Sequence, residues 1–288
     1  MKRIVFIFSF LMIGTLAFAQ ITEAEDDLRS VNADTSKGWT TGGMVNINLA
    51  QSSFSNWAAG GQNSLGVNGL ITAFANYRVG SSTWDNMLDV GYGVLQQGKG
   101  TGFIKTDDKI DFSSKFGRKA SKEWYYAAML NFKTQMTKGY NYPDDVNVIS
   151  RLFAPAYLIG AVGMDYKPSP VLTAFISPFT AKTTFVLDDD LANAGAFGVI
   201  PAEFDELGVM VVPGQKVRSE LGGYVRIVFN KTFFKDKSVS LLSKLDLFSN
   251  YLHKPQNIDV NWENIISFKI NKYISATITT QLIYDDDI

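Results

Sequence analysis

The segment ISATITTQLIY, residues 274–284, alternates between apolar and polar side chains along most of its length. Ile278 and Leu282 fall on one set of alternate positions, and Thr277 and Thr279 fall on the other. A side-chain period of two is the geometry of a β-strand with one apolar and one polar face. Because the same pattern recurs along the chain, a sheet with two chemically different faces is the first constraint on the fold.

Segments with this alternation are separated by clusters of Gly, Asn, Asp, Ser and Pro, which are typical turn residues. A helical period of 3.6 would scatter their charges around the whole circumference, and their β-branched and aromatic residues favour strands. The sequence therefore predicts an all-β fold from about residue 39. Eleven segments can be named, near residues 43–51, 65–79, 84–94, 109–116, 126–135, 155–167, 171–182, 217–230, 239–251, 258–270 and 274–284.

The N-terminus has the form of a secretion signal. Lys2 and Arg3 precede an apolar run over residues 4–18, and Ala-Phe-Ala at 17–19 is a small-x-small cleavage site before Gln20. We expect cleavage after residue 19, because the apolar run is short for a helix that spans a membrane. The predicted organisation is a signal peptide (1–19), a flexible acidic lead-in in the periplasm (20–38) and a β-domain (39–288).

Composition excludes several classes of function. The chain of 288 residues has a formal net charge of −1, so it has no basic surplus to neutralise the phosphates of a nucleic acid. It has no cysteine, which excludes disulfides, thiolate metal sites, cysteine nucleophiles and a lipoprotein anchor. Beyond the signal no apolar stretch approaches the length of a transmembrane helix.

Three features favour a membrane β-barrel over a secreted β-sandwich, which remains an alternative. Several segments exceed the usual length of strands in soluble proteins. Short connections alternate with long ones near residues 97–106, 139–154 and 183–215, as in barrels with short periplasmic turns and long outer loops. Aromatic residues lie near segment ends, where a membrane interface favours them. The candidate interface aromatics are Tyr77, Trp84, Trp124, Trp262 and Tyr284.

We therefore predict a transmembrane, antiparallel, up-and-down β-barrel in the outer membrane, in contact with outer-membrane lipids. Bacterial single-chain barrels have an even number of strands. Since eleven segments can be named, the prediction is about twelve strands, with ten also possible. We expect a missing strand within residues 183–215. The same long loop could instead fold into the lumen as a constriction or contact another outer-membrane protein.

The polar face is predicted to line the lumen, with nearly matched numbers of cations and anions. Unpaired charges in a narrow lumen would be costly, which favours ion pairs that cross-link the wall. The alternative is a polar conduit with weak ion selectivity, since no ring of one sign is visible. The candidate lumen-facing residues are Arg78, Asp89, Lys109, Asp111, Lys133, Arg218, Glu220, Arg226, Lys244, Asp246, Asp259, Glu263 and Lys269.

Catalytic and metal signals are weak. His253 is the sole histidine, and a lipid hydrolase in the outer membrane would need it as general base, with Ser249 and Asp246 nearby. No Gly-x-Ser-x-Gly motif accompanies it. The acidic runs at 188–190 and 285–287 lack the ligand spacing of a calcium loop, so we expect solvated charges, no metal and no cofactor.

Three short segments carry a resemblance to a known family: FSNWAAGGQNS at 54–64, VNWEN at 260–264 and YDDD at 284–287. Through them the chain, from about Trp39 onward, resembles uncharacterised outer-membrane proteins of Gram-negative bacteria that are grouped under a domain of unknown function. The resemblance implies an outer-membrane barrel and assigns no functional residues. Within the first motif, the glycine pair at 60 and 61 permits positive φ in a tight link.

The functional expectation is accordingly a non-enzymatic barrel, either a small polar channel or a structural barrel that contacts assembly partners. The His253 hydrolase and the secreted β-sandwich are the alternatives.

Overall fold

The computed structural model describes residues 37–56, 58, 60–98, 100–234, 238–271 and 274–285. The expected signal peptide, nearly all of the expected lead-in, and Trp57 of the first motif lie outside these residues.

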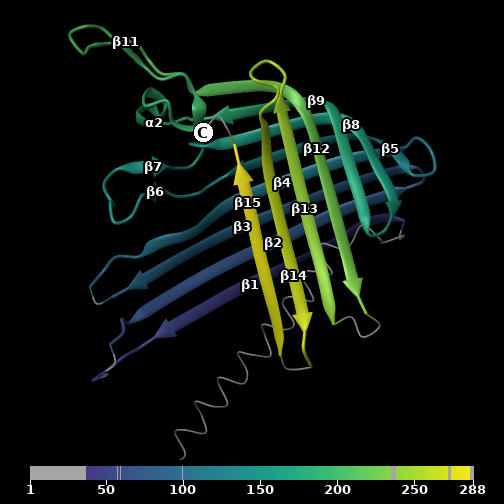
Figure 1. The fold of residues 1–288 in the computed structure, drawn as a ribbon, viewed down its shortest axis with the longest axis horizontal. Helices are drawn as coiled ribbons and strands as arrows, with labels where there is room; N and C mark the ends of the chain where they lie inside the picture. The colour runs from purple at the N-terminus through teal and green to yellow at the C-terminus, as the bar shows by residue number, and fades with distance from the viewer. Residues whose placement is uncertain are drawn as a thin grey trace, which may run out of the picture.

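One antiparallel sheet of eleven strands dominates the fold, and its strands neighbour one another in chain order (Figure 1). The order is that of an up-and-down meander, as predicted, and it does not match the two packed sheets of a β-sandwich. The strands are β1 (Gly38–Ser52), β2 (Ser64–Val79), β3 (Ser82–Gln97), β4 (Ile104–Lys119), β5 (Trp124–Thr134), β8 (Ala156–Ser169), β9 (Leu172–Phe185), β12 (Val217–Phe233), β13 (Val239–Asn250), β14 (Ile258–Lys269) and β15 (Ser275–Tyr284).

The two ends of the sheet differ in their connections. At one end, here the turn end, the links are short, and the link between β2 and β3 contains only Gly80, with φ +56°, and Ser81. At the other end, the loop end, the links include residues 135–155 and 186–216. The loop between β1 and β2 also lies there, and Gly60 and Gly61 adopt φ of +80° and +130° in it.

The loops carry the remaining elements. Residues 135–155 contain a small hairpin of β6 (Gly139–Tyr140) and β7 (Val148–Ser150). Residues 186–216 contain α2 (Asp189–Asn193), the short 3₁₀ helix η2 (Ala196–Gly198), and a second hairpin of β10 (Glu203–Phe204) and β11 (Met210–Val212). Among the residues that the structure describes, no helix has the length and apolar character to cross a membrane.

The sheet has eleven strands in the described residues, so the expectation of twelve, or ten, is wrong here. The extra strand that we expected within residues 183–215 is the β10–β11 hairpin, which pairs only with itself. Pro201 and Pro213 flank it and cannot donate ladder hydrogen bonds, which separates it from the long strands. With eleven alternating strands, β1 and β15 run in the same direction, and no pairing joins them in the described chain.

The sheet is strongly curled, so that β12 to β15 pass in front of β1 to β4 (Figure 1). Side chains meet across the enclosed space from strands that are not neighbours. Lys182 on β9 lies 2.8 Å from Asp259 on β14, and Lys115 on β4 lies 2.8 Å from Asp165 on β8. The enclosed space is called the lumen below.

Burial is inverted relative to a soluble protein. On the outer face, large apolar side chains are exposed along the strands, for example Ile47 at 65%, Val162 at 62% and Phe179 at 70%. On the inner face, Asp165, Glu220 and other polar side chains are buried. Soluble monomers rarely expose contiguous apolar surface of this extent. The apolar faces predicted from the alternation therefore point outward, away from the lumen.

Candidate functional site

The inner face of the sheet is the candidate site. Strand register determines which side chains share it, because directly paired residues point to the same side. Asp89 pairs with Asp111, and Asp111 pairs with Lys133, across β3, β4 and β5. By the same register the structure places all thirteen candidate lumen residues on this face: Arg78, Asp89, Lys109, Asp111, Lys133, Arg218, Glu220, Arg226, Lys244, Asp246, Asp259, Glu263 and Lys269.

Most of these charges meet an opposite charge within the lumen. Arg226 and Asp246 form a bidentate pair, through Nε–Oδ1 at 2.5 Å and Nη2–Oδ2 at 3.1 Å. The Tyr224 hydroxyl donates to the same carboxylate at 2.7 Å. Bidentate arginine–carboxylate contacts of this kind are strong and geometrically specific. Further ion pairs join Arg78 to Asp85, Lys133 to Asp111, and Arg218 to Glu220.

Lys182 is a junction of the lumen that the sequence did not indicate. Its ammonium lies 2.8 Å from Asp259, 3.4 Å from Asp285 and 3.8 Å from Glu220, so it connects β9, β12, β14 and the end of β15. The segment 171–182 alternates weakly because a bulge interrupts β9. Around Pro178 the register shifts by one residue, so the inner face changes from Phe175 and Ser177 to Thr180 and Lys182.

A buried apolar cluster also fills part of the lumen. It contains Ala127, Met129, Ala161, Phe175, Tyr224 and Phe248. The rings of Phe175 and Tyr224 have centroids 6.3 Å apart. Gly222 leaves room for Phe248, because a Cβ at residue 222 would lie 2.8 Å from that ring. These side chains come from five consecutive strands of the sheet, β5 to β13, so they cover the inner face there and narrow the lumen.

A small cavity lies beside this cluster. Its volume is about 170 Å³, and its lining includes Tyr157, Lys182, Arg226, Asp246 and Asp259. No residue of the 186–216 loop lines it. Side chains of the strands therefore narrow the lumen. The cavity gives no support to the expectation that the loop within residues 183–215 folds into the lumen as a constriction.

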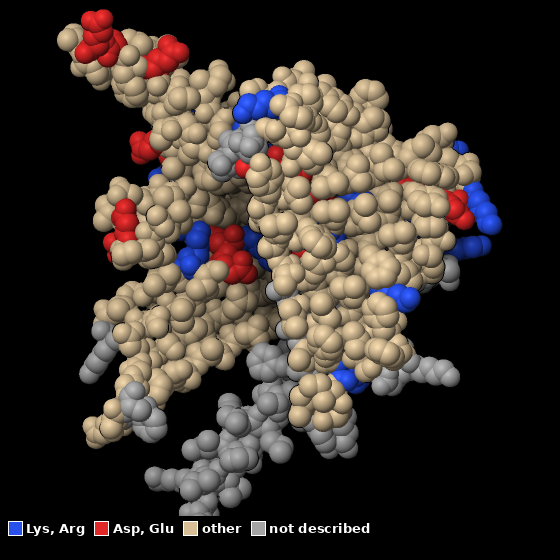
Figure 2. Space-filling model, in the orientation of Figure 1, with Lys and Arg blue, Asp and Glu red and all other residues tan. Residues whose placement is uncertain are grey.

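Aromatic side chains gather at the strand ends on the outer face. At the turn end, Trp39 has ring contacts with Tyr77 and Trp84 at centroid distances of 5.1 and 5.7 Å. Trp124 and Tyr166 form another pair there, 4.6 Å apart. Trp262 and Tyr284 lie on β14 and β15, toward the loop end, and both are about half exposed. The space-filling view shows few charged atoms over β12 to β15 (Figure 2).

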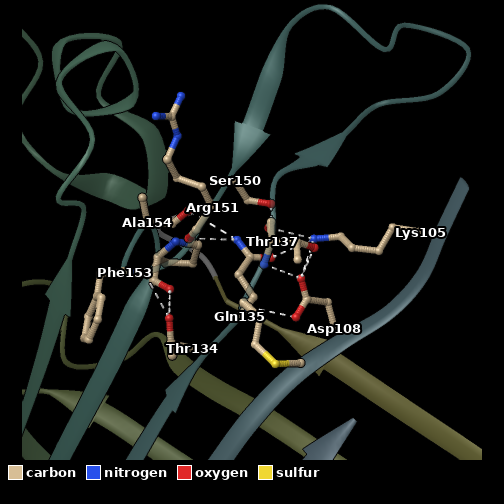
Figure 3. A network of polar contacts seen from close by, with 11 residues as sticks. Lys105, Asp108, Thr134, Gln135, Thr137, Ser150, Arg151, Phe153 and Ala154 are labelled. Atoms are coloured by element: carbon tan, nitrogen blue, oxygen red, sulfur yellow. Dashed lines mark hydrogen bonds and ion pairs between the residues drawn. The ribbon is translucent and has the colours of Figure 1, made fainter. Parts of the chain in front are cut away.

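A polar network fastens the first long loop to the sheet (Figure 3). Asp108 on β4 accepts hydrogen bonds from the backbone N–H groups of Met136 and Thr137, at 2.8 and 2.9 Å, and pairs with Lys105. Gln135 donates to the carbonyl oxygens of Arg151 and Ala154, both at 3.3 Å. Residues 135–155 are therefore fastened to β4 at the loop end of the sheet.

Within this loop, Asp144 organises a turn. Its carboxylate accepts hydrogen bonds from the backbone N–H groups of Asn147 and Val146, at 3.0 and 2.9 Å, and from the Asn147 amide at 2.7 Å. These donors, the Asn147 backbone first, hold the pKa of Asp144 below its ordinary value.

The second long loop packs on the first. Ala154 joins Val186, Leu191, Ala192 and Val199 in a small buried cluster. Asp188 caps the N-terminus of α2 by accepting from Leu191 N–H, and its other oxygen pairs with Arg151 at 2.8 Å. Within the acidic run at 188–190, Asp188 thus has a structural role as a helix cap and ion-pair partner. Within the described residues, no group of three or more acidic or histidine side chains is arranged to hold a metal.

The residues of the hydrolase alternative do not converge. His253 is exposed in the loop after β13. The Ser249 hydroxyl donates to the Pro255 carbonyl at 2.7 Å, and Asp246 lies in the lumen with Arg226. In a hydrolytic triad the nucleophile contacts the base and the base contacts the acid. Ser249, His253 and Asp246 are not arranged in this way.

A family model and a solved structure match the chain. Residues 49–140 match a family model described as a protein of unknown function (DUF3078). This range contains the 54–64 motif and is narrower than the resemblance from Trp39 onward. No curated protein matches the chain. Among solved structures, the translocator domain of the autotransporter NalP from Neisseria meningitidis is similar at 9% identity and a TM-score of 0.37, over 95% of this chain and 92% of that one.

Proposed function

We propose that this chain is a non-enzymatic β-barrel protein of the outer membrane, whose lumen is closed by its own side chains and which acts as a structural or assembly-partner barrel. The inverted burial is the observation that carries the membrane assignment. Exposed large apolar residues lie on ten of the eleven long strands, all except β13, and they would be unfavourable in water and are favourable against lipid.

The membrane setting also accounts for the aromatic positions. Trp and Tyr favour the headgroup level, where one part of the ring meets hydrocarbon and the polar atom meets water. Trp84 and Trp262 satisfy their indole N–H groups with Ser114 and Ser243, at 2.9 and 3.0 Å. The outer membrane is supported by the expected signal peptide together with a β-structured, rather than helical, lipid-facing surface.

The packed lumen favours a structural role over an open channel. A conducting pore needs a continuous aqueous path, whereas Met129, Phe175, Tyr224 and Phe248 pack together on the inner face of β5 to β13 and take up part of the lumen. The ion pairs around Arg226 and Lys182 add cross-links between strands. A closed, cross-linked lumen gives a stiff scaffold and leaves the loop end as the surface for contacts.

A small polar channel is the second candidate, and the cavity of about 170 Å³ beside Lys182 and Arg226 favours it. The cavity would be one chamber of a path that opens when the apolar cluster moves. Its mixed charges would give weak ion selectivity, since carboxylates and cations line it together.

Planar-bilayer recording separates the two candidates. The structural proposal expects no discrete conductance steps from the purified wild-type protein. It expects steps from a variant in which Phe175→Ala and Phe248→Ala remove two rings from the lumen. Phe179→Ala is the control, because this ring is on β9 like Phe175 but is exposed on the outer face. Stepwise conductance by the wild-type protein would favour the channel.

A further inference from the structure

The β10–β11 hairpin, defined here as residues 200–215, projects from the loop end, away from the curled sheet (Figure 1). Two strands of two and three residues form its ladder, and they pair with no other strand. An isolated two-stranded ribbon is marginally stable in water, and each of its strands is an open edge.

The hairpin is nevertheless a defined structure. At its base, Ala202 N–H donates to the Asn193 carbonyl at 2.9 Å and Gly214 N–H donates to the Asn193 side-chain oxygen at 2.9 Å. At its tip, the Asp205 carboxylate accepts from the N–H groups of Leu207 and Val209, at 2.9 and 2.8 Å. The contacts fix the ribbon to α2 and set its turn, so its outward position is built in.

Its surface is apolar to an unusual degree for a loop. Leu207 is 88% exposed, and the other large apolar side chains of the ribbon are exposed by 43–59%. They are Ile200, Phe204, Val209, Met210, Val211 and Val212. Because they lie beyond the strand ends of the sheet, lipid around the barrel wall does not account for them. Exposed contiguous apolar surface of this kind marks an interaction site.

The charge of the hairpin restricts the partner. Residues 200–215 contain Glu203, Asp205 and Glu206 and no Lys or Arg. Acidic atoms mark the tip of the projecting ribbon (Figure 2). A second copy of the hairpin would bring like charges together, which is unfavourable. A basic partner would neutralise them.

We propose that the hairpin is a docking site for a partner protein, which adds an extended strand with apolar side chains and Lys or Arg residues to the ribbon edge. Backbone hydrogen bonds along the open edge, apolar contacts with Leu207 and Val211, and ion pairs with Glu203 and Glu206 provide the recognition. Such strand addition is a general mode of peptide binding. The inference rests on the proposed partner-contacting role of the barrel.

The test uses the full chain in detergent micelles and a fluorescent ten-residue peptide of alternating Val and Lys as the probe. We expect saturable binding, and binding about tenfold weaker for a peptide with Glu in place of Lys. Leu207→Ser with Val211→Ser, and separately Glu203→Gln with Glu206→Gln, should each weaken binding of the Val-Lys peptide about tenfold or more. Asp145→Asn with Val146→Ser is the matched control, since both residues are exposed in the neighbouring loop.

Equal binding by the hairpin variants and the wild-type chain would overturn the proposal. So would a wild-type dimer in analytical ultracentrifugation that the Leu207→Ser, Val211→Ser variant loses, because the occupant would then be a second copy. Peptide binding is measured independently of conductance and membrane insertion. A failure here is therefore distinguishable from a failure of the proposed barrel function.

Discussion

Arg226 on β12 and Asp246 on β13 form a bidentate ion pair inside the lumen, and the Tyr224 hydroxyl donates to the same carboxylate. The Arg226 side chain also reaches Met129 on β5, with Nη1 lying 3.7 Å from Sδ. One arginine therefore contacts both the neighbouring strand β13 and β5, which is three strands away in the sheet. These contacts pack the Arg226 side chain inside the lumen, where the loss of its charge should be costly.

Arg226→Met should destabilise the folded barrel by about 3–5 kcal/mol, because it leaves Asp246 buried without its cation. The double variant Arg226→Met with Asp246→Asn should recover much of that loss, since the asparagine can still accept from Tyr224. Urea unfolding followed by tryptophan fluorescence in liposomes measures both. Equal destabilisation by the single and the double variant would contradict the buried-pair account.

Lys182 and Asp259 should be energetically coupled although β9 and β14 are separated by two strands in the sheet. A double-mutant cycle with Lys182→Met and Asp259→Asn is expected to give a coupling of about 0.5–3 kcal/mol. The pair Lys133 and Asp111 is the comparison, because these residues are on adjacent strands and meet whether or not the sheet is curled. Coupling only in the comparison pair would mean that the walls of the lumen do not meet.

Val162→Arg should lower the stability of the inserted barrel by about 2–4 kcal/mol, because it would place a charge against hydrocarbon near the middle of β8. The same exposure in a water-soluble protein would make the change nearly neutral. Val146→Arg is the control, since Val146 is 80% exposed in the outer loop. Unfolding midpoints of the two variants should differ clearly. A neutral Val162→Arg would argue against lipid at this face.

Asp108→Asn should release the loop 135–155, because an amide nitrogen would replace one of the oxygens that accept from Met136, Thr137 and Lys105. Loss of such a buried acceptor costs on the order of 1–3 kcal/mol. We expect trypsin to cleave after the exposed Lys138 about tenfold faster, since local opening governs such cleavage. Asp145→Asn should leave the rate unchanged, and an unchanged rate in Asp108→Asn would show that the network does not fasten the loop.

The alternation predicted the sheet and its two faces because a period of two determines side-chain direction without knowledge of neighbours. Tyr224 has the parity of Glu220 and Arg226, but it is not among the thirteen predicted lumen residues, all of which carry a charge. Lys182 was missed because the bulge near Pro178 breaks the period. The structure of the two long loops was not predictable, since their contacts, such as Arg151 with Asp188, follow no period.

The strand count shows another limit. The even strand number of known barrels predicted one more strand, which we expected within residues 183–215, and the structure has the hairpin of β10 and β11 there. Its flanking prolines and short ladder prevent it from joining the sheet. For this segment, the even strand number of known barrels was therefore a poorer guide than Pro201 and Pro213, which flank the hairpin.

The most direct test of the proposed barrel is the lipid exposure of its outer face. The chain has no native cysteine, so a single cysteine can carry a nitroxide at Ile71, Val162 or Leu221, one at a time, in liposomes. The barrel predicts frequent collisions with oxygen and few with a water-soluble nickel chelate at all three sites, and the reverse at Val146. High nickel accessibility at Ile71, Val162 and Leu221 would contradict a membrane-spanning barrel.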